Sequence, residues 1–370
     1  MHLHIISFNI PYPANYGGVI DVYYKIKALH ELGVSVHLHC FEYGRAHAPE
    51  LEEICASVNY YDRKLSVKYF AKIRPFIVAT RQNDALLENL LKDDYPILFE
   101  GIHTCYFLTQ DVLKNRKKIV RLHNIESDYY RALGKREANV LRRIYFFTEA
   151  YKLRNFENKL SAAQLVLPIS LKDTQILQAH YSHVHHLPAF HQNESVNTPG
   201  GTGDYCLYHG NLSVNENIKS AMYVAKVFSE LQIPLIIAGS QPSDALTAYC
   251  NKYPNIQLIA DPDDETLDKL IKQAQINVLP AFQATGLKLK LLHALHQGRH
   301  VIVNSAMIAG SHLEQLCHIA DDIVHMREMI NKLMTLPLTA EEIQLRTHVL
   351  TANFSNKHNA QLLMNFVEAL

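Results

Sequence analysis

Short apolar segments alternate with helical patterns along the whole chain. In the first half, strands are expected over residues 3–8, 34–41, 96–99, 118–122 and 166–169. In the second half, they are expected over residues 205–209, 235–238, 256–259, 276–279 and 301–303. Helical periodicity separates them, as over residues 19–33, 218–231, 266–274 and 287–296. This alternation predicts an α/β protein with two Rossmann-like domains, whose parallel sheets face each other across a cleft.

The predicted boundary between these domains is a polar segment. Residues 193–204 are rich in Gly, Pro, Thr and Ser, which is typical of a linker. The expected domains are therefore residues 1–190 and residues 205–345. A chain of 370 residues is long enough for two domains of average size.

Composition excludes some partners and compartments. Lys+Arg and Asp+Glu are balanced at 36 each, so no nucleic-acid partner is expected. The six cysteines are scattered, and no secretory pattern or bilayer-spanning run occurs, which predicts a cytoplasmic protein. The 22 histidines form no HExxH motif, and no metal site is expected. Residues 131–160 predict a basic helix, which is either a solvated face or a peripheral contact with anionic lipid.

Three loops carry candidate chemistry. The first is residues 15–18, Asn-Tyr-Gly-Gly, which follows the first strand and opens the first helix. Backbone N–H groups at such a position attract anions, and glycine permits close approach, although a plain turn is the alternative. No GxGxxG motif occurs in the chain, which weighs against a nicotinamide-dependent dehydrogenase.

The second loop is residues 121–126, Arg-Leu-His-Asn-Ile-Glu, directly after a strand. His123 can donate a hydrogen bond to a sugar hydroxyl or to a leaving group, whereas Asn124 and Glu126 are equally suited to cap the next helix. Glu100 ends another strand and is either an acceptor-side group or a helix cap.

The third loop begins at Thr285-Gly286 and opens a helix that carries Lys288 and Lys290. Two ammonium groups beside helix-terminal amides suit a diphosphate. The alternative is an ordinary amphipathic helix with its leucines facing the core, and both interpretations can hold together.

These segments, in this order, resemble the GT-B fold glycosyltransferases close to glycosyltransferase family 4. Tyr208 to Ser213 and Ile237-Ala-Gly239 add two further segments of that family, and the resemblance covers nearly the whole chain. It implies donor and nucleotide binding by Gly17, Gly18, Gly210, Asn211, Gly239, Thr285, Gly286, Leu287 and His293. It implies catalytic roles for His123, Lys288 and Lys290, and acceptor-side roles for Asn15, Glu100, Arg121 and Asn124. It also implies that residues 346–370 form a helix that crosses back to the first domain.

The implied reaction is transfer of a sugar from a nucleotide diphosphate to a hydroxyl of a glycan or lipid-linked acceptor. The resemblance further implies retention of configuration and no metal or other cofactor. His293 stands where the family normally has Glu, and Thr285 where many members have a second Glu. A neutral imidazole has one donor and one acceptor, whereas a carboxylate accepts both ribose hydroxyls. Two alternative hypotheses follow. The chain could be a non-catalytic paralogue that binds a partner, or it could be a nucleotide-sugar 2-epimerase.

Overall fold

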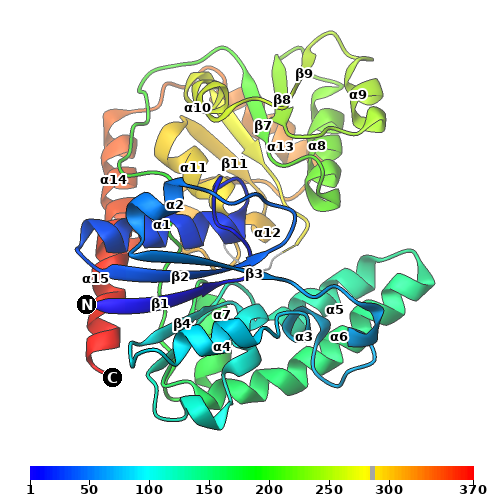
Figure 1. Ribbon diagram of the computed structural model, residues 1–370. Coiled ribbons are helices and arrows are strands. Elements are labelled where there is room, and N and C mark those ends of the chain that lie inside the picture. Colours follow the sequence, from blue (N-terminus) through cyan, green and yellow to red (C-terminus); the bar gives the residue numbers. More distant parts are fainter. Residues whose placement is uncertain (284–287) are drawn as a thin grey trace. The chain divides into compact units, whose positions relative to one another are not determined.

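The structure of the protein is a computed structural model that describes residues 1–283 and 288–370, and the chain forms two compact units (Figure 1). The first unit consists of Met1–His191 together with Asn356–Leu370, and the second of Gln192–Ser355. Residues 346–355, which were expected in the returning segment, lie in the second unit.

The first unit is built on a parallel sheet of six strands in the order β3-β2-β1-β4-β5-β6. Its strands are β1 (His2–Ser7), β2 (Ser35–Glu42), β3 (Ser57–Asp62), β4 (Ile97–Glu100), β5 (Lys118–Leu122) and β6 (Leu165–Pro168). Its helices are α1 (Gly17–Glu31), α2 (Glu50–Ile54), α3 (Phe76–Ala79), α4 (Asp84–Leu90), α5 (Glu126–Arg136), α6 (Val140–Glu157), α7 (Leu171–Gln178) and α15 (Asn356–Glu368). Strands β4, β5 and β6 are buried throughout, which explains why most of their residues are apolar.

The second unit repeats this plan with the strand order β12-β11-β10-β7-β8-β9. Its strands are β7 (Cys206–His209), β8 (Leu235–Gly239), β9 (Ile256–Ala260), β10 (Ile276–Leu279), β11 (His300–Val303) and β12 (His318–Ile319). Its helices are α8 (Asn215–Phe228), α9 (Asp244–Cys250), α10 (Asp264–Gln273), α11 (Leu289–Gln297), α12 (Ser305–Ile308), α13 (Ile323–Leu333) and α14 (Ala340–Phe354). The prediction of an α/β protein with two parallel sheets is thus confirmed.

Helices α5 and α6 differ from the single helix that the sequence predicted. The single helix expected over residues 131–160 is wrong, because α5 and α6 are separate helices that pack against each other. The side chain of Asn139 caps α6 by accepting from the Arg142 N–H, which starts a new helix at this point. Helix α15 packs against α1 and buries Ala360, Leu363 and Val367 in the core of the first unit.

A chain of hydrogen bonds links polar side chains of the neighbouring strands β1, β2 and β3. Asp93 accepts from His4 Nε2 at 2.9 Å, so His4 Nδ1 is the acceptor for His39 Nε2 at 2.8 Å. His39 Nδ1 in turn accepts from the Tyr61 hydroxyl at 2.8 Å, and the Tyr61 oxygen accepts from Asn89. Each donor therefore meets one acceptor only while both histidines are neutral. Burial lowers the pKa of His4, and it lowers the pKa of His39 to about 3.

We expect this network to make the protein lose stability in mild acid. The unfolded chain binds protons at its histidines below pH ~6.5, whereas the folded pKa of His39 is about 3, so stability falls as the pH drops through this interval. His39 alone should cost about 2 kcal/mol of unfolding free energy between pH ~7.5 and pH ~5. Urea denaturation at both pH values measures the loss. The loss of unfolding free energy should be smaller in His39→Gln but unchanged in the exposed control His30→Gln. Equal losses in the natural protein and both variants would show that His39 does not cause the acid sensitivity.

Candidate active site

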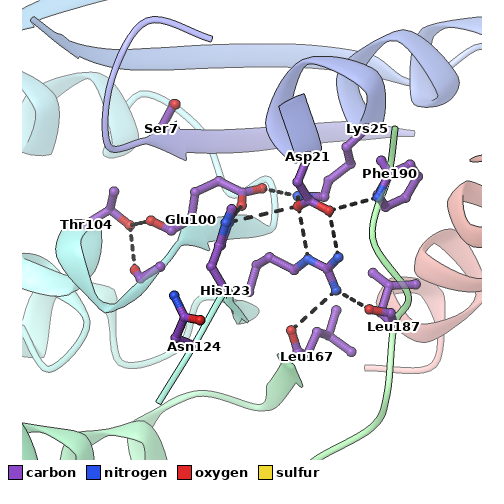
Figure 2. A network of polar contacts seen from close by, with 12 residues as sticks. Ser7, Asp21, Lys25, Glu100, Thr104, His123, Asn124, Leu167, Leu187 and Phe190 are labelled. Carbon is purple, nitrogen blue, oxygen red and sulfur yellow. Dashed lines mark hydrogen bonds and ion pairs between the residues drawn. The ribbon is translucent and has the colours of Figure 1, made fainter. Parts of the chain in front are cut away.

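The candidate catalytic side chains of the first unit lie at the carboxyl ends of two neighbouring strands. Glu100 ends β4, and His123 follows β5 (Figure 2). Glu100 Oε2 accepts from His123 Nε2 at 3.1 Å, which leaves Nδ1 as the acceptor nitrogen of a neutral ring. The His123 side chain is 13% exposed, whereas that of Glu100 is fully buried. Only the histidine of this pair therefore reaches the surface.

Buried charges from α1 and β5 surround this pair. Lys25 Nζ donates to Asp21 at 2.9 Å and to Glu100 at 2.5 Å, and Arg121 donates to both oxygens of Asp21 (Figure 2). Burial alone would raise the pKa of both carboxyl groups. Arg121 and Lys25 outweigh burial at Asp21, and Lys25 and His123 outweigh it at Glu100, so both pKa values lie below the usual range. Two carboxylates and two cations thus neutralise each other without solvent.

The same cluster has the residue types of a metal site. Asp21, Glu100 and His123 place one ligand atom each within 4.8 Å of one another. However, the ammonium group of Lys25 and the guanidinium group of Arg121 already bind the two carboxylates. A divalent cation would have to displace these fixed positive charges. The donor set therefore fits a self-neutralised network that holds His123 better than it fits a metal centre.

Arg121 was expected on the acceptor side, but its surroundings indicate a bracing role. Its side chain is fully buried. Besides Asp21, it donates to the carbonyl oxygens of Leu187 and Pro188, and Asp21 also accepts from the Phe190 N–H. The guanidinium group therefore ties the segment that follows residue 186 to the sheet.

The Phe8 ring, which was not expected to be part of the site, contacts both the glycine loop and His123. A Cβ atom at Gly18 would come within 2.7 Å of the Phe8 ring, and this ring contacts His123 edge-on at 5.5 Å between centroids. Gly17 and Asn15 are exposed, and Asn15 Oδ1 accepts from Arg45 at 2.9 Å. Gly18 and His123 are thus brought to one place, which their separation in sequence does not reveal.

Asn124 and Glu126 lie at the start of α5. Glu126 is buried and accepts from Asn124 Nδ2 at 3.5 Å; burial raises the Glu126 pKa to about 7. Glu157 accepts from the Ser127 N–H and hydroxyl, and so caps the helix that Asn124 or Glu126 was expected to cap.

The second unit collects polar groups where β7 ends. Lys290, in the first turn of α11, donates to Asn217 Oδ1 at 3.1 Å and to the Tyr208 hydroxyl at 3.3 Å. Asn217 Nδ2 donates to the Asn211 carbonyl at 2.9 Å, and the ammonium group is 3.5 Å from the position of a Cβ at Gly210. Burial, followed by the charge of Lys288, lowers the pKa of Lys290 to about 7. We call this set, Gly210, Asn211, Asn217 and Lys290, the β7 corner.

The chain is similar to several known proteins. Residues 203–335 match the family described as Glycosyl transferases group 1. An uncharacterised 44.6 kDa protein in the cps region of Klebsiella pneumoniae is 28% identical over 350 residues, which cover 88% of this chain and 89% of its own. Among solved structures, S. aureus TarM has a TM-score of 0.70 at 10% identity over 99% of each chain. Anabaena HepE has a TM-score of 0.68 at 11% identity over the full length of both.

The chain is a glycosyltransferase of the GT-B fold. The family match lies within the second unit and includes the β7 corner, and the two solved structures share the fold of the whole chain. The resemblance found in the sequence is thereby confirmed for fold and enzyme class, while membership of family 4 stays a prediction.

His293 occupies a different environment in this glycosyltransferase than the sequence analysis assumed. Its side chain is buried, with Nδ1 at 2.9 Å from Asn193 Oδ1 and Nε2 at 2.8 Å from Asp268 Oδ1. Both ring nitrogens therefore have protein partners, which tie α11 to α10 and to the segment around residue 193. A role for His293 in holding ribose directly would require one of these contacts to break. Thr285, Gly286 and Leu287, which were expected to offer backbone amides to the donor, lie outside the described residues.

Gly239 supports the β7 corner from the end of β8. A Cβ atom there would overlap the Gly210 carbonyl oxygen and approach Leu212 Cγ to 2.9 Å. The Gly210 N–H donates to the Ala238 carbonyl at 3.1 Å, so the two strand ends pack directly against each other. Only glycine permits this approach, and Gly239 therefore shapes the corner without offering a side chain to a ligand.

We expect Gly239→Ala to displace the Gly210 turn in this glycosyltransferase. Overpacking of this kind costs about 1–3 kcal/mol of unfolding free energy, and here the obstacle is backbone. Urea denaturation measures the cost. The matched control is Gly200→Ala, since a Cβ there is 3.8 Å from its nearest neighbours. If both variants were as stable as the natural protein, the close packing of the two strand ends would be disproved.

Among the described residues, no helix is both long enough and apolar enough to cross a bilayer.

Proposed function

We propose that this glycosyltransferase transfers a hexosyl group from a UDP-sugar to an acceptor hydroxyl, with retention of configuration and without a metal ion. The observation that carries the proposal is the β7 corner, where a partly buried ammonium group lies beside a glycine turn at the carboxyl end of a parallel strand. Ligands of open α/β sheets bind at such strand ends. The solved structures of HepE in complex with UDP and glucose, and of a TarM mutant in complex with UDP, support the choice of base.

Fixed cations support the metal-free part of the proposal. When the sugar leaves, negative charge develops on the diphosphate, and preorganised positive groups stabilise it most effectively where water is scarce. Lys290 and Lys288 supply such groups from the start of α11. Retention of configuration rests on the family resemblance alone.

Within the first unit, we assign His123 to the transferred sugar. Its exposed edge and acceptor Nδ1 can receive a hydrogen bond from a sugar hydroxyl, while Glu100 fixes the ring. Gly17 and Gly18 permit close approach of the donor, and Asn15 and Asn124 remain candidates for the acceptor side. Glu100 is fully buried, so we assign it a positioning role in place of direct contact with the acceptor.

The acceptor is proposed to be a glycan or a lipid-linked glycan. The Klebsiella relative supports polysaccharide biosynthesis as the setting, because its name places it in the cps region. We also propose that the enzyme acts in the cytoplasm, at or near a membrane, where such acceptors are assembled.

The proposal is tested by thermal unfolding with UDP, GDP, ADP, TDP and CDP, each with EDTA and again with Mg²⁺. Binding to the folded state raises the midpoint by mass action. We expect UDP to give the largest rise and EDTA to leave it unchanged. The UDP-sugars are then screened for release of UDP, with and without candidate acceptors.

Each arm of this experiment can overturn one part of the proposal. A larger rise with another nucleotide would replace uridine, and a rise that requires Mg²⁺ would overturn metal independence. Absence of any rise at millimolar nucleotide would overturn the donor class, and would favour a paralogue that binds a different ligand.

A further inference from the structure

Helix α6 carries an apolar stripe on its outer face. Val140, Ile144, Phe147 and Tyr151 follow one another at three- and four-residue spacing, which places them on one side of the helix, with Leu141 beside them. Their exposed fractions are 56%, 57%, 42% and 70%, and that of Leu141 is 78%. Single exposed apolar residues are ordinary, but an adjacent set of five indicates an interaction surface. We call these five residues the α6 stripe.

A second exposed apolar group lies on the segment between β3 and α3. Leu65, Val67, Phe70 and Ile73 are 57%, 81%, 43% and 94% exposed. This segment, residues 63–75, runs beside α6 (Figure 1). The Phe70 ring contacts Tyr145 of α6 edge-on at 5.4 Å, and the Phe70 carbonyl accepts from Lys152 at 2.7 Å. The α6 stripe and this segment therefore belong to one region of the first unit, which we call the 63–75/α6 surface.

The charges of this surface have one sign. Residues 63–75 contain Arg63, Lys64, Lys68, Lys72 and Arg74, and no Asp or Glu. Helix α6 adds Arg142, Arg143, Lys152 and Arg154. Its two acidic residues are buried: Glu149 accepts from the Phe76 N–H and Lys152, and Glu157 accepts from Ser127. The exposed part of both segments is therefore apolar and cationic.

We propose that the 63–75/α6 surface docks the first unit onto a bilayer that contains anionic phospholipid. Apolar side chains that enter the headgroup region, mixed with lysines and arginines that meet lipid phosphates, are what such a surface requires. The core of a protein–protein interface is instead depleted in charge. The residues of this surface differ from those assigned to the donor, so the inference does not depend on the proposed reaction.

The test is co-sedimentation of the full chain with vesicles of phosphatidylcholine alone or mixed with phosphatidylglycerol. We expect binding to the mixed vesicles, weakening as salt is raised, and little binding to phosphatidylcholine. Two double variants separate the contributions: Leu141→Ser with Ile144→Ser, and Lys68→Glu with Lys72→Glu. Each should lower the vesicle partition coefficient about tenfold or more. The matched control is Val324→Ser, an equally exposed apolar residue of the second unit.

All these substitutions are at exposed positions, and an unchanged unfolding midpoint and nucleotide response establish that each variant is folded. Equal binding to both vesicle types, absence of binding, or unchanged binding by both double variants would overturn the proposal. Sedimentation velocity provides the remaining arm. Self-association that the Leu141/Ile144 variant abolishes, without vesicle binding, would instead make this surface an interface between copies.

Discussion

Replacing Lys290 with Met should lower the affinity for UDP by roughly ten- to a hundredfold, because a charge-assisted hydrogen bond is worth about 1.5–3 kcal/mol. The change keeps a linear side chain that is shorter by one heavy atom, and it removes the charge. Titration calorimetry at a single pH near 7 measures the loss. The matched control is Lys269→Met, a lysine on α10 whose side chain is 64% exposed and pairs with Glu265. Equal affinity in Lys290→Met and the natural enzyme would remove Lys290 from the diphosphate site.

The lowered pKa of Lys290 adds a pH dependence whose sign can be worked out. In the free enzyme its pKa is about 7, so the group is increasingly neutral above that pH. A bound diphosphate favours the ammonium form, and binding therefore takes up a proton. UDP affinity should fall by up to about tenfold per pH unit between pH ~7.5 and pH ~9, where the diphosphate itself is ionised.

Lys290→Arg is the control variant for this pH dependence, because its guanidinium group remains charged throughout this range. Its UDP affinity should vary little between pH ~7.5 and pH ~9, even if the absolute value is lower. A flat profile in the natural enzyme would contradict the predicted uptake of a proton by Lys290. The same slope in Lys290→Arg would show that another group causes the dependence.

The parallel sheets were predictable from the sequence because their central strands are buried on both faces. Strands β4, β5 and β10 are buried at every residue, and at most two residues in each of them are polar. Strand β3 escaped detection since it is the edge strand and mostly half-buried, with the polar sequence Ser-Val-Asn-Tyr-Tyr-Asp. The break between α5 and α6 was missed because a single cap residue, Asn139, marks it.

The residues of the candidate site were also only partly predictable from the sequence. His123, Lys290 and Gly210 stand in segments whose order along the chain carries the family resemblance. Asp21 and Lys25 were missed because an acidic and a basic residue four apart on a helix normally indicate a surface ion pair. Here both are buried.

Their burial depends on a partner far along the chain, since Arg121 binds Asp21 across 100 residues. His293 shows the same limit: Asn193 and Asp268 engage its ring from 100 and 25 residues away. Patterns of local periodicity do not encode such contacts.

Replacing His123 with Ala should reduce turnover by about 10²–10³-fold while leaving the UDP-induced rise in the unfolding midpoint unchanged. A group that assists only at the sugar contributes to kcat and not to nucleotide affinity. The matched control is His180→Ala, the same substitution at an exposed position of the first unit. Equal activity of the His123 variant would exclude this residue from the reaction, and loss of the UDP response would show that the variant acts through the fold.

Glu100→Gln tests how His123 is held. The amide retains the size of the carboxylate, but its NH₂ group can point at His123 Nε2 and so favour the opposite tautomer, in which Nδ1 carries the proton. We expect a fall in kcat with little change in KM, because the ring would then present an N–H donor where the sugar hydroxyl needs an acceptor. Glu100→Asp keeps the carboxylate as an acceptor and should recover part of the natural kcat. If Glu100→Gln left kcat unchanged, the carboxylate would serve the buried Lys25 pair alone, and another contact would have to set the tautomer of His123.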